Sequence, residues 1–70
     1  MKQTESLAEA LPEEMARVRE VLGYYQEIGP AGMFGALFIE ADLRAADRAV
    51  MSGDVVEMLK AYAKLKEIKS

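Results

Sequence analysis

Cysteine and histidine are both absent from the 70-residue sequence. Without cysteine, the chain forms no disulfide and no thiolate metal site. Without histidine, it lacks the commonest metal ligand and the side chain most often used as a general base near neutral pH. Carboxylate sites remain open, but the Asp/Asn pattern of a calcium loop does not occur. We therefore expect no metal, no cofactor and no enzymatic activity.

Long apolar runs and positive charge are scarce as well. No run approaches the ~20 residues that a membrane-spanning helix needs, and the start, MKQTESLAEALPEE, lacks the apolar stretch of a signal peptide. The net charge of -3 disfavours nucleic acid and anionic membranes as partners, because both are negatively charged. These features predict a cytoplasmic protein.

The chain is also short. Seventy residues make one domain at most, and below roughly 80 residues a single core supplies only a few kcal/mol of stability. Small folds usually add a disulfide, a metal ion or a partner subunit. Since the composition excludes the first and disfavours the second, we expect self-association, in the simplest case as a homodimer.

Helical periodicity runs through most of the chain, and no segment has the sustained alternation of a strand. We predict an all-α fold with a single domain over residues 1–70, a small three-helix protein of helical hairpins that packs as a homodimer. Residues 1–11 are expected to form a flexible or one-turn lead. The helices are expected at about 12–28, 32–51 and 54–68.

The first helix is expected to begin at Pro12, because proline is tolerated in the first turn and carboxylates follow it. Ser6 and Glu9 fit a capping box, which allows one turn before it. The helix is expected to end at Gly29, with Pro30 as a stop. Its predicted buried stripe comprises Leu11, Met15, Val18, Leu22 and Tyr25, with Val21 and Ile28 beside them.

The third helix has equally clear signals at its start. Asp54 is expected to cap it, and Gly53 supplies the positive φ of the preceding turn. Its predicted buried stripe comprises Val55, Met58, Leu59, Tyr62 and Leu65.

The middle helix is apolar over roughly two thirds of its circumference when residues are placed about 100° apart. A helix with so wide an apolar arc must be covered on two sides, either by both flanking helices or by a second copy of the chain. The expected oligomer interface consists of Phe34, Gly35, Phe38, Asp42, Ala45 and Ala49.

Asp42 is the one charged residue inside this arc. Gly35 and Ala49, seven residues to either side of it, would let another helix backbone come close. An ionised carboxylate is costly there unless a partner satisfies it. A structural hydrogen bond within the fold and a functional role, as a ligand contact or a register-setting group between subunits, both remain open.

The segment EIGPAGMFG carries glycines at a three-residue spacing, but it lacks the lysine and hydroxyl of a P-loop and the preceding strand of a dinucleotide fingerprint. Glycine followed by proline ordinarily ends one helix and begins another, so we interpret the segment as a helix joint. The alternative is an anion or nucleotide site at the start of the middle helix. That site would consist of Ala31, Gly32 and Met33, with Arg44 and Arg48.

Tyr24 lies on the charged side of the first helix, away from the buried stripe. Tyrosine and arginine are frequent in binding hot spots, so Tyr24, Arg17 and Glu20 form the predicted contact surface for a partner protein. Arg17 also lies four residues after Glu13, the favourable orientation for a surface ion pair.

Residues 28–68, IGPAGMFGALFIEADLRAADRAVMSGDVVEMLKAYAKLKEI, resemble a pattern in short, largely uncharacterised proteins of temperate phages and prophages of proteobacteria. The segment contains no catalytic motif. The resemblance implies a small protein made in the host cytoplasm that binds and modulates a host protein. Some small helical phage proteins of other families bind the cyclic nucleotides of host immunity instead, which keeps the nucleotide-binding alternative open.

Overall fold

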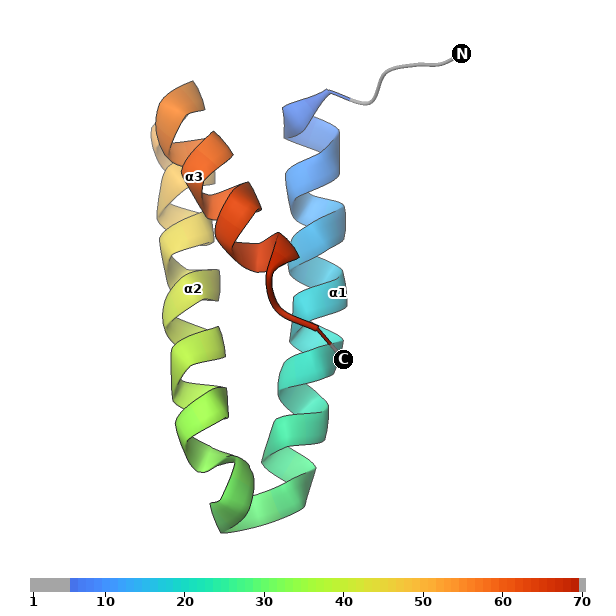
Figure 1. Cartoon of the computed structure of the whole chain (residues 1–70). Helices are drawn as coiled ribbons and strands as arrows, with labels where there is room; N and C mark the ends of the chain where they lie inside the picture. Colours follow the sequence, from blue (N-terminus) through green and yellow to red (C-terminus); the bar gives the residue numbers. More distant parts are fainter. Residues whose placement is uncertain (1–5, 70) are drawn as a thin grey trace.

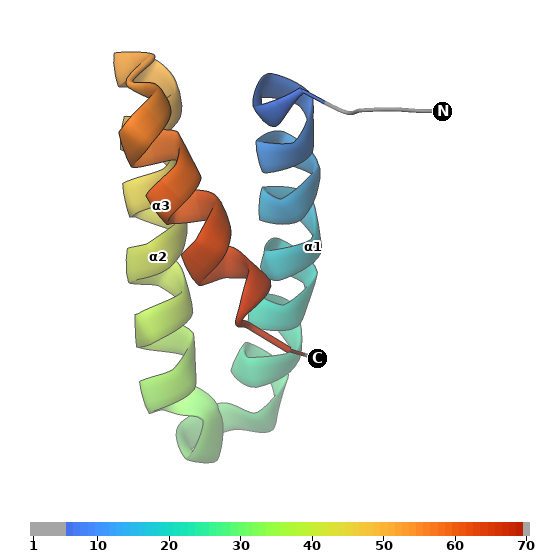
Figure 2. The ribbon, with the colours of Figure 1, turned by 45° about the horizontal axis from the view of Figure 1, so that its top comes forward.

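The computed structural model describes residues 6–69. Within this range it contains helices and no strand: α1 (Leu7–Ile28), the 3-10 helix η1 (Gly29–Gly32), α2 (Met33–Ser52) and α3 (Val55–Lys66). α1 and α2 form an antiparallel hairpin closed by η1, and α3 crosses back over this hairpin on a diagonal toward α1 (Figures 1 and 2). The predicted all-α, three-helix fold is confirmed. The homodimer stays a prediction.

The start of α1 corrects the sequence-based boundary, because the helix begins at Leu7 and not at Pro12. The Ser6 N–H donates to Glu9 Oε1 at 3.4 Å, and the Ser6 carbonyl accepts from the N–H groups of Glu9 and Ala10. These bonds start the helix five residues before the proline. Pro12 therefore lies inside α1, where it lacks one helical hydrogen bond and its ring crowds the carbonyl one turn earlier. The rest of the predicted lead, residues 1–5, lies outside the described residues.

The helix ends beside Gly29, Gly53 and Asp54 follow the predicted signals, whereas α3 ends at Lys66, two residues before the predicted end. Gly29 ends α1 with a φ of 84°, and Gly53 ends α2 with a φ of 71°, conformations that cost glycine little. The Asp54 carboxylate caps α3 by accepting from the N–H groups of Val56 at 3.0 Å and Glu57 at 3.3 Å. The predicted end at Gly29 and the predicted cap at Asp54 are confirmed.

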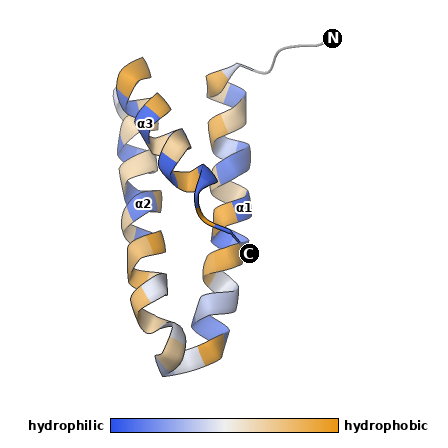
Figure 3. Cartoon of the chain, viewed as in Figure 1, coloured by the Kyte–Doolittle hydropathy of each residue, from blue (hydrophilic) through white to orange (hydrophobic). Residues whose placement is uncertain are grey.

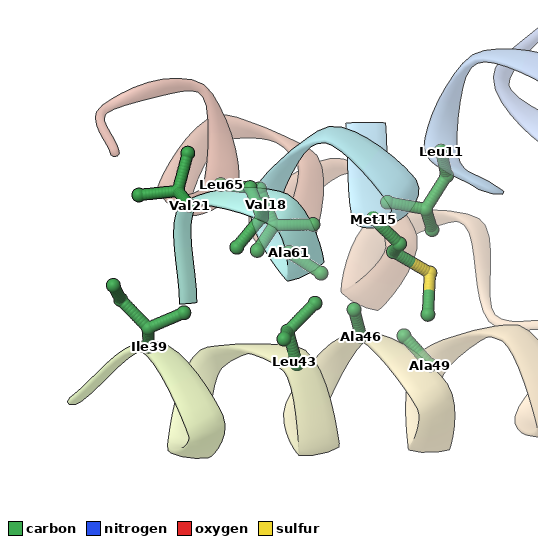
Figure 4. Packing of buried hydrophobic residues seen from close by; sticks show 10 residues of the cluster. All are labelled: Leu11, Met15, Val18, Val21, Ile39, Leu43, Ala46, Ala49, Ala61 and Leu65. Atoms are coloured by element: carbon green, nitrogen blue, oxygen red, sulfur yellow. The ribbon is translucent and has the colours of Figure 1, made fainter. Parts of the chain in front are cut away.

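The core lies where the three helices meet (Figure 4). Leu11 and Val18 of α1 and Leu65 of α3 are fully buried. α2 contributes two alanines to this contact, and small side chains let neighbouring helices approach closely. The core cluster comprises Leu11, Met15, Val18, Val21, Ile39, Leu43, Ala46, Ala49, Ala61 and Leu65.

Three residues that were expected in buried stripes are exposed instead: Ile28 at 61%, Val55 at 60% and Leu59 at 53%. Ile28 and Val55 are terminal residues of their helices, where few neighbouring side chains are within reach. Leu59 lies on the outer side of α3, because that helix packs on Ala61 and Leu65. A small residue at Ala61 allows a closer approach to the hairpin than a leucine would.

Candidate protein-binding surface

Apolar residues occur along the whole length of α2 (Figure 3), but the core takes up only one side of the helix. Phe34 is 80% exposed, Phe38 is 73% exposed and Leu37 is 53% exposed. Helical spacing places these residues on one outward-facing strip, which we call the α2 stripe. The α2 stripe comprises Phe34, Leu37, Phe38, Ala41, Ala45 and Arg48.

The length of α3 explains why the stripe is uncovered at its aromatic end. α3 has 12 residues and α2 has 20, so α3 accompanies α2 over only part of its length (Figures 1 and 2). Ala45 lies beside Lys60 and Ala61 of α3. Phe38 is seven residues before Ala45, two turns away on the same side of the helix. The stripe is therefore alanine where α3 runs alongside and aromatic where α3 has turned away.

A hollow of about 240 Å³ opens at the alanine end of the stripe. Four of its residues come from α2 at relative positions i, i+3, i+4 and i+7, which is the spacing of the hole that receives a side chain in knobs-into-holes helix packing. Its fifth residue belongs to α3. This α2–α3 hollow is lined by Ala45, Arg48, Ala49, Ser52 and Glu57.

Tyr25 determines how the hairpin closes. A Cβ added at Gly35 would overlap the Tyr25 ring, and a Cβ added at Gly32 would overlap the Tyr25 carbonyl. Because they lack a Cβ, these two glycines allow the chain to pack closely against Tyr25 of α1 in the same chain. Gly35 was predicted at an oligomer interface, yet the structure places it half-buried against Tyr25.

A second pocket, of about 310 Å³, lies at the η1 end of the hairpin. Its walls are mainly apolar. At its edge, the Gln26 side-chain amide donates to Glu40 Oε2 at 3.4 Å. The pocket is lined by Tyr25, Gln26, Gly29, Pro30, Met33, Ala36, Leu37 and Glu40.

The predicted contact surface on α1 is only partly available. Tyr24 is 58% exposed and Glu20 is exposed. Arg17 is half-buried, because its guanidinium donates to Glu14 Oε2 at 2.8 Å and to the Leu65 carbonyl of α3 at 3.0 Å. Arg17 thus joins α1 to α3 inside the fold.

The same contacts correct the predicted ion pair, because Arg17 bonds Glu14 where Glu13 was expected. The Arg17 side chain points toward α3, on the side of α1 where the half-buried Glu14 lies. Glu13 is exposed and lies away from this contact. The Arg17 hydrogen bond lowers the pKa of the Glu14 carboxyl below its usual value, against the opposing effect of burial, and the charges of Arg17, Lys66 and Lys69 lower it further.

The residues of the predicted anion site are not brought together. Ala31, Gly32 and Met33 lie at the η1 end of α2, and the Met33 N–H already donates to the Pro30 carbonyl. Arg44 lies eleven residues beyond Met33, about 16 Å along a helix that rises 1.5 Å per residue, and Arg48 is a further turn away. Neither Arg44 nor Arg48 is therefore near the start of α2.

Asp42 is half-buried, and no charged or polar residue is fully buried among residues 6–69. The sequence placed Asp42 inside the apolar arc of the middle helix, whereas the structure places the centre of the buried side at Ile39, Leu43 and Ala46. The carboxylate consequently reaches the edge of the core, where it retains contact with solvent. This position favours neither a structural hydrogen bond nor a functional role for Asp42.

Some surface features have no counterpart in the sequence-based prediction. Leu37 and Ser52 were not identified as site residues, although both share the helical spacing of Phe34 and Ala45. A second exposed apolar group surrounds the turn between α2 and α3. It comprises Val50, Met51, Val55, Val56 and Leu59.

Among residues 6–69, no group of three or more Asp and Glu side chains is placed to hold a metal ion. No helix in the described range has both the length and the apolar character needed to cross a membrane. Comparison with protein-family models, curated proteins and solved structures found no match to this chain.

Proposed function

We propose that the protein is a non-enzymatic interaction protein that self-associates through the α2 stripe and, in that form, binds and modulates another protein. The observation that carries this proposal is the exposure of Phe34 at 80% and Phe38 at 73% on a well-formed helix. Large exposed apolar patches typically mark protein–protein interaction sites. Aromatic side chains also supply much of the energy of such interfaces.

The second contact, with a different protein, is assigned to the outer side of α1. Tyr24 and Glu20 are exposed there, on a different helix from the α2 stripe, and Tyr24 has both an apolar ring and a hydroxyl for a partner. Arg17 is left out of this surface because its guanidinium holds α3. The resemblance of residues 28–68 to small phage proteins suggests a protein of a bacterial host as the target.

Sedimentation velocity over a range of concentrations tests self-association. We expect a reversible monomer–oligomer equilibrium in the micromolar range. A chain that stays monomeric throughout would contradict the proposal.

Affinity capture from a bacterial lysate tests the second contact. A protein that binds through α1 is recovered by the wild type and is lost with Tyr24→Ala. The control is Ala16→Ser, an exposed position on the same helix. Recovery that is unaffected by Tyr24→Ala would remove α1 from the proposal.

A further inference from the structure

We infer that the α2 stripe binds a second copy of this chain in an antiparallel orientation, with Phe34 of each copy seated in the α2–α3 hollow of the other. This inference rests on the proposed function, because it identifies the occupant of the surface that mediates self-association. It assigns a role to three features of one helix side: an exposed ring at one end, small residues in the middle and a hollow at the other end.

The hollow has the helical spacing and the room to receive one side chain. Its α2 residues have the i, i+3, i+4, i+7 spacing that surrounds an inserted side chain in helix packing. The hollow is open to solvent and measures about 240 Å³, with Arg48, Ser52 and Glu57 at its polar rim. Ala45 and Ala49 supply small walls, so the ring of Phe34 enters without displacing a large side chain.

The ring and the hollow lie on the same helix, which is the requirement for a two-fold dimer. In such a dimer, every contact occurs twice. If a residue of one copy contacts a site on the partner, the same residue of the partner contacts the same site on the first copy. Phe34 and Arg48 are fourteen residues apart, and Ala41 is midway between them. When α2 pairs antiparallel about an axis at Ala41, Phe34 meets the hollow at Arg48, and Leu37, four residues before the axis, meets Ala45, four residues after it.

Charge favours the antiparallel orientation over the parallel one. Parallel pairing in register would place Arg48 against Arg48 of the partner subunit, a repulsive contact, and would crowd the aromatic residues at the other end. Antiparallel pairing brings the Arg48 guanidinium close to the face of an incoming Phe34 ring, an attractive cation–π contact. The dipoles of the paired α2 helices also oppose one another, which is favourable.

The two exposed rings supply about half of the area that a specific interface needs. With roughly 200 Å² for an aromatic side chain, the exposed parts of Phe34 and Phe38 amount to about 300 Å² per copy. Two copies therefore bury about 600 Å² from these rings alone, half of the roughly 1,200 Å² at which specific interfaces begin. Leu37, between the two rings, and Ala41 and Arg48, beyond them, are also exposed and add to the contact.

Single cysteines test the orientation, because the chain has no cysteine of its own. Ala41→Cys places a thiol at the two-fold axis, and Ser52→Cys places one eleven residues away on the same side of α2. At 1.5 Å per residue, two copies of Ser52 lie about 33 Å apart in the antiparallel dimer. A disulfide needs Cα atoms within about 7 Å. Both reduced variants are first compared with the wild type by thermal melting and by sedimentation.

Under mild oxidation, Ala41→Cys is expected to form a covalent dimer, while Ser52→Cys stays monomeric on a denaturing gel. If both variants cross-link, the pairing is parallel and the inference is wrong, although self-association stands. If neither cross-links while sedimentation still detects a dimer, the second copy uses another surface and the inference is wrong. A protein that is monomeric in sedimentation overturns the proposed function as well.

Discussion

The ring of Tyr25 lies so close to the backbone of Gly35 that a single added methyl group at Gly35 would overlap it. This contact joins the last turns of α1 to the first turns of α2 and determines how tightly the hairpin closes beside η1. Phe34 is adjacent to Gly35 in the chain, so the position of the exposed ring depends on the same contact.

Gly35→Ala is therefore expected to destabilise the fold by about 1–3 kcal/mol, the usual cost of overpacking a close contact. Chemical denaturation measures this change. The matched control is Gly23→Ala in α1, where an added Cβ meets nothing within 4 Å. That substitution should stabilise the protein by about 0.4–1 kcal/mol, because alanine reduces the entropy of the unfolded chain. Equal effects of the two substitutions would show that Tyr25 does not confine Gly35.

The Glu14 and Arg17 pair predicts an acid-sensitive contribution to stability. Because the Arg17 hydrogen bond lowers the pKa of Glu14 in the folded state, the unfolded chain takes up the proton at a higher pH than the folded chain. The contribution is fully present above the ordinary glutamate pKa and is lost as the pH falls through the lowered value.

Arg17→Gln should raise the pKa of Glu14 and make the Tm less dependent on pH in the acid range. NMR titration of the Glu14 carboxyl carbon measures the first effect and thermal melting the second. Arg44→Gln, at an exposed position on α2, serves as the control and should leave the pKa of Glu14 unchanged. A Glu14 pKa that is the same in Arg17→Gln and the wild type would contradict the assigned cause.

The cap of α3 gives a third prediction. Asp54→Ala removes the acceptor for the N–H groups of Val56 and Glu57 and should cost about 1 kcal/mol of stability. For a domain of this size, that corresponds to a decrease in Tm of about 4–8 °C. Asp54→Ser retains a capping oxygen and should recover most of the loss. If Asp54→Ser is as unstable as Asp54→Ala, the capping bonds are not the reason.

Local signals in the sequence were sufficient to predict much of this fold. The spacing of Leu11, Met15 and Val18 identified the buried side of α1. Gly29 and Asp54 marked a helix end and a helix start, because their conformational and hydrogen-bonding roles depend only on near neighbours. The start of α1 was missed because two local signals competed there, a capping box and a proline, and the capping box prevailed.

The remaining errors concern contacts between helices. Whether Leu59 or Ala61 faces the hairpin depends on how closely α3 approaches it, and the position of Asp42 relative to the core depends on where α3 crosses α2. Gly35 was correctly identified as a site of close approach, but its neighbour is Tyr25 of the same chain. Periodicity identifies the apolar side of a helix, but it does not indicate which neighbour covers which turn.

Substitutions at two equally exposed leucines test whether self-association uses the α2 stripe or another surface. Leu37 lies on the stripe and Leu59 lies on the outer side of α3, and each is 53% exposed. Leu37→Ser should weaken self-association, because it removes apolar area from the interface, whereas Leu59→Ser should leave it unchanged. Sedimentation at several concentrations compares the two variants. A larger effect at Leu59 would place the interface around the α2–α3 turn.

The most direct test of the central claim is the dimer dissociation constant of the wild type and of Phe34→Ser, measured by sedimentation equilibrium. Phe34 is 80% exposed in a single chain, so its replacement should leave the helical content and the Tm of the monomer nearly unchanged. Truncation of an aromatic hot spot costs at least about 2 kcal/mol, which corresponds to an increase in the dissociation constant of more than about tenfold. A dissociation constant that is unchanged in Phe34→Ser would contradict the assignment of the α2 stripe as the self-association surface.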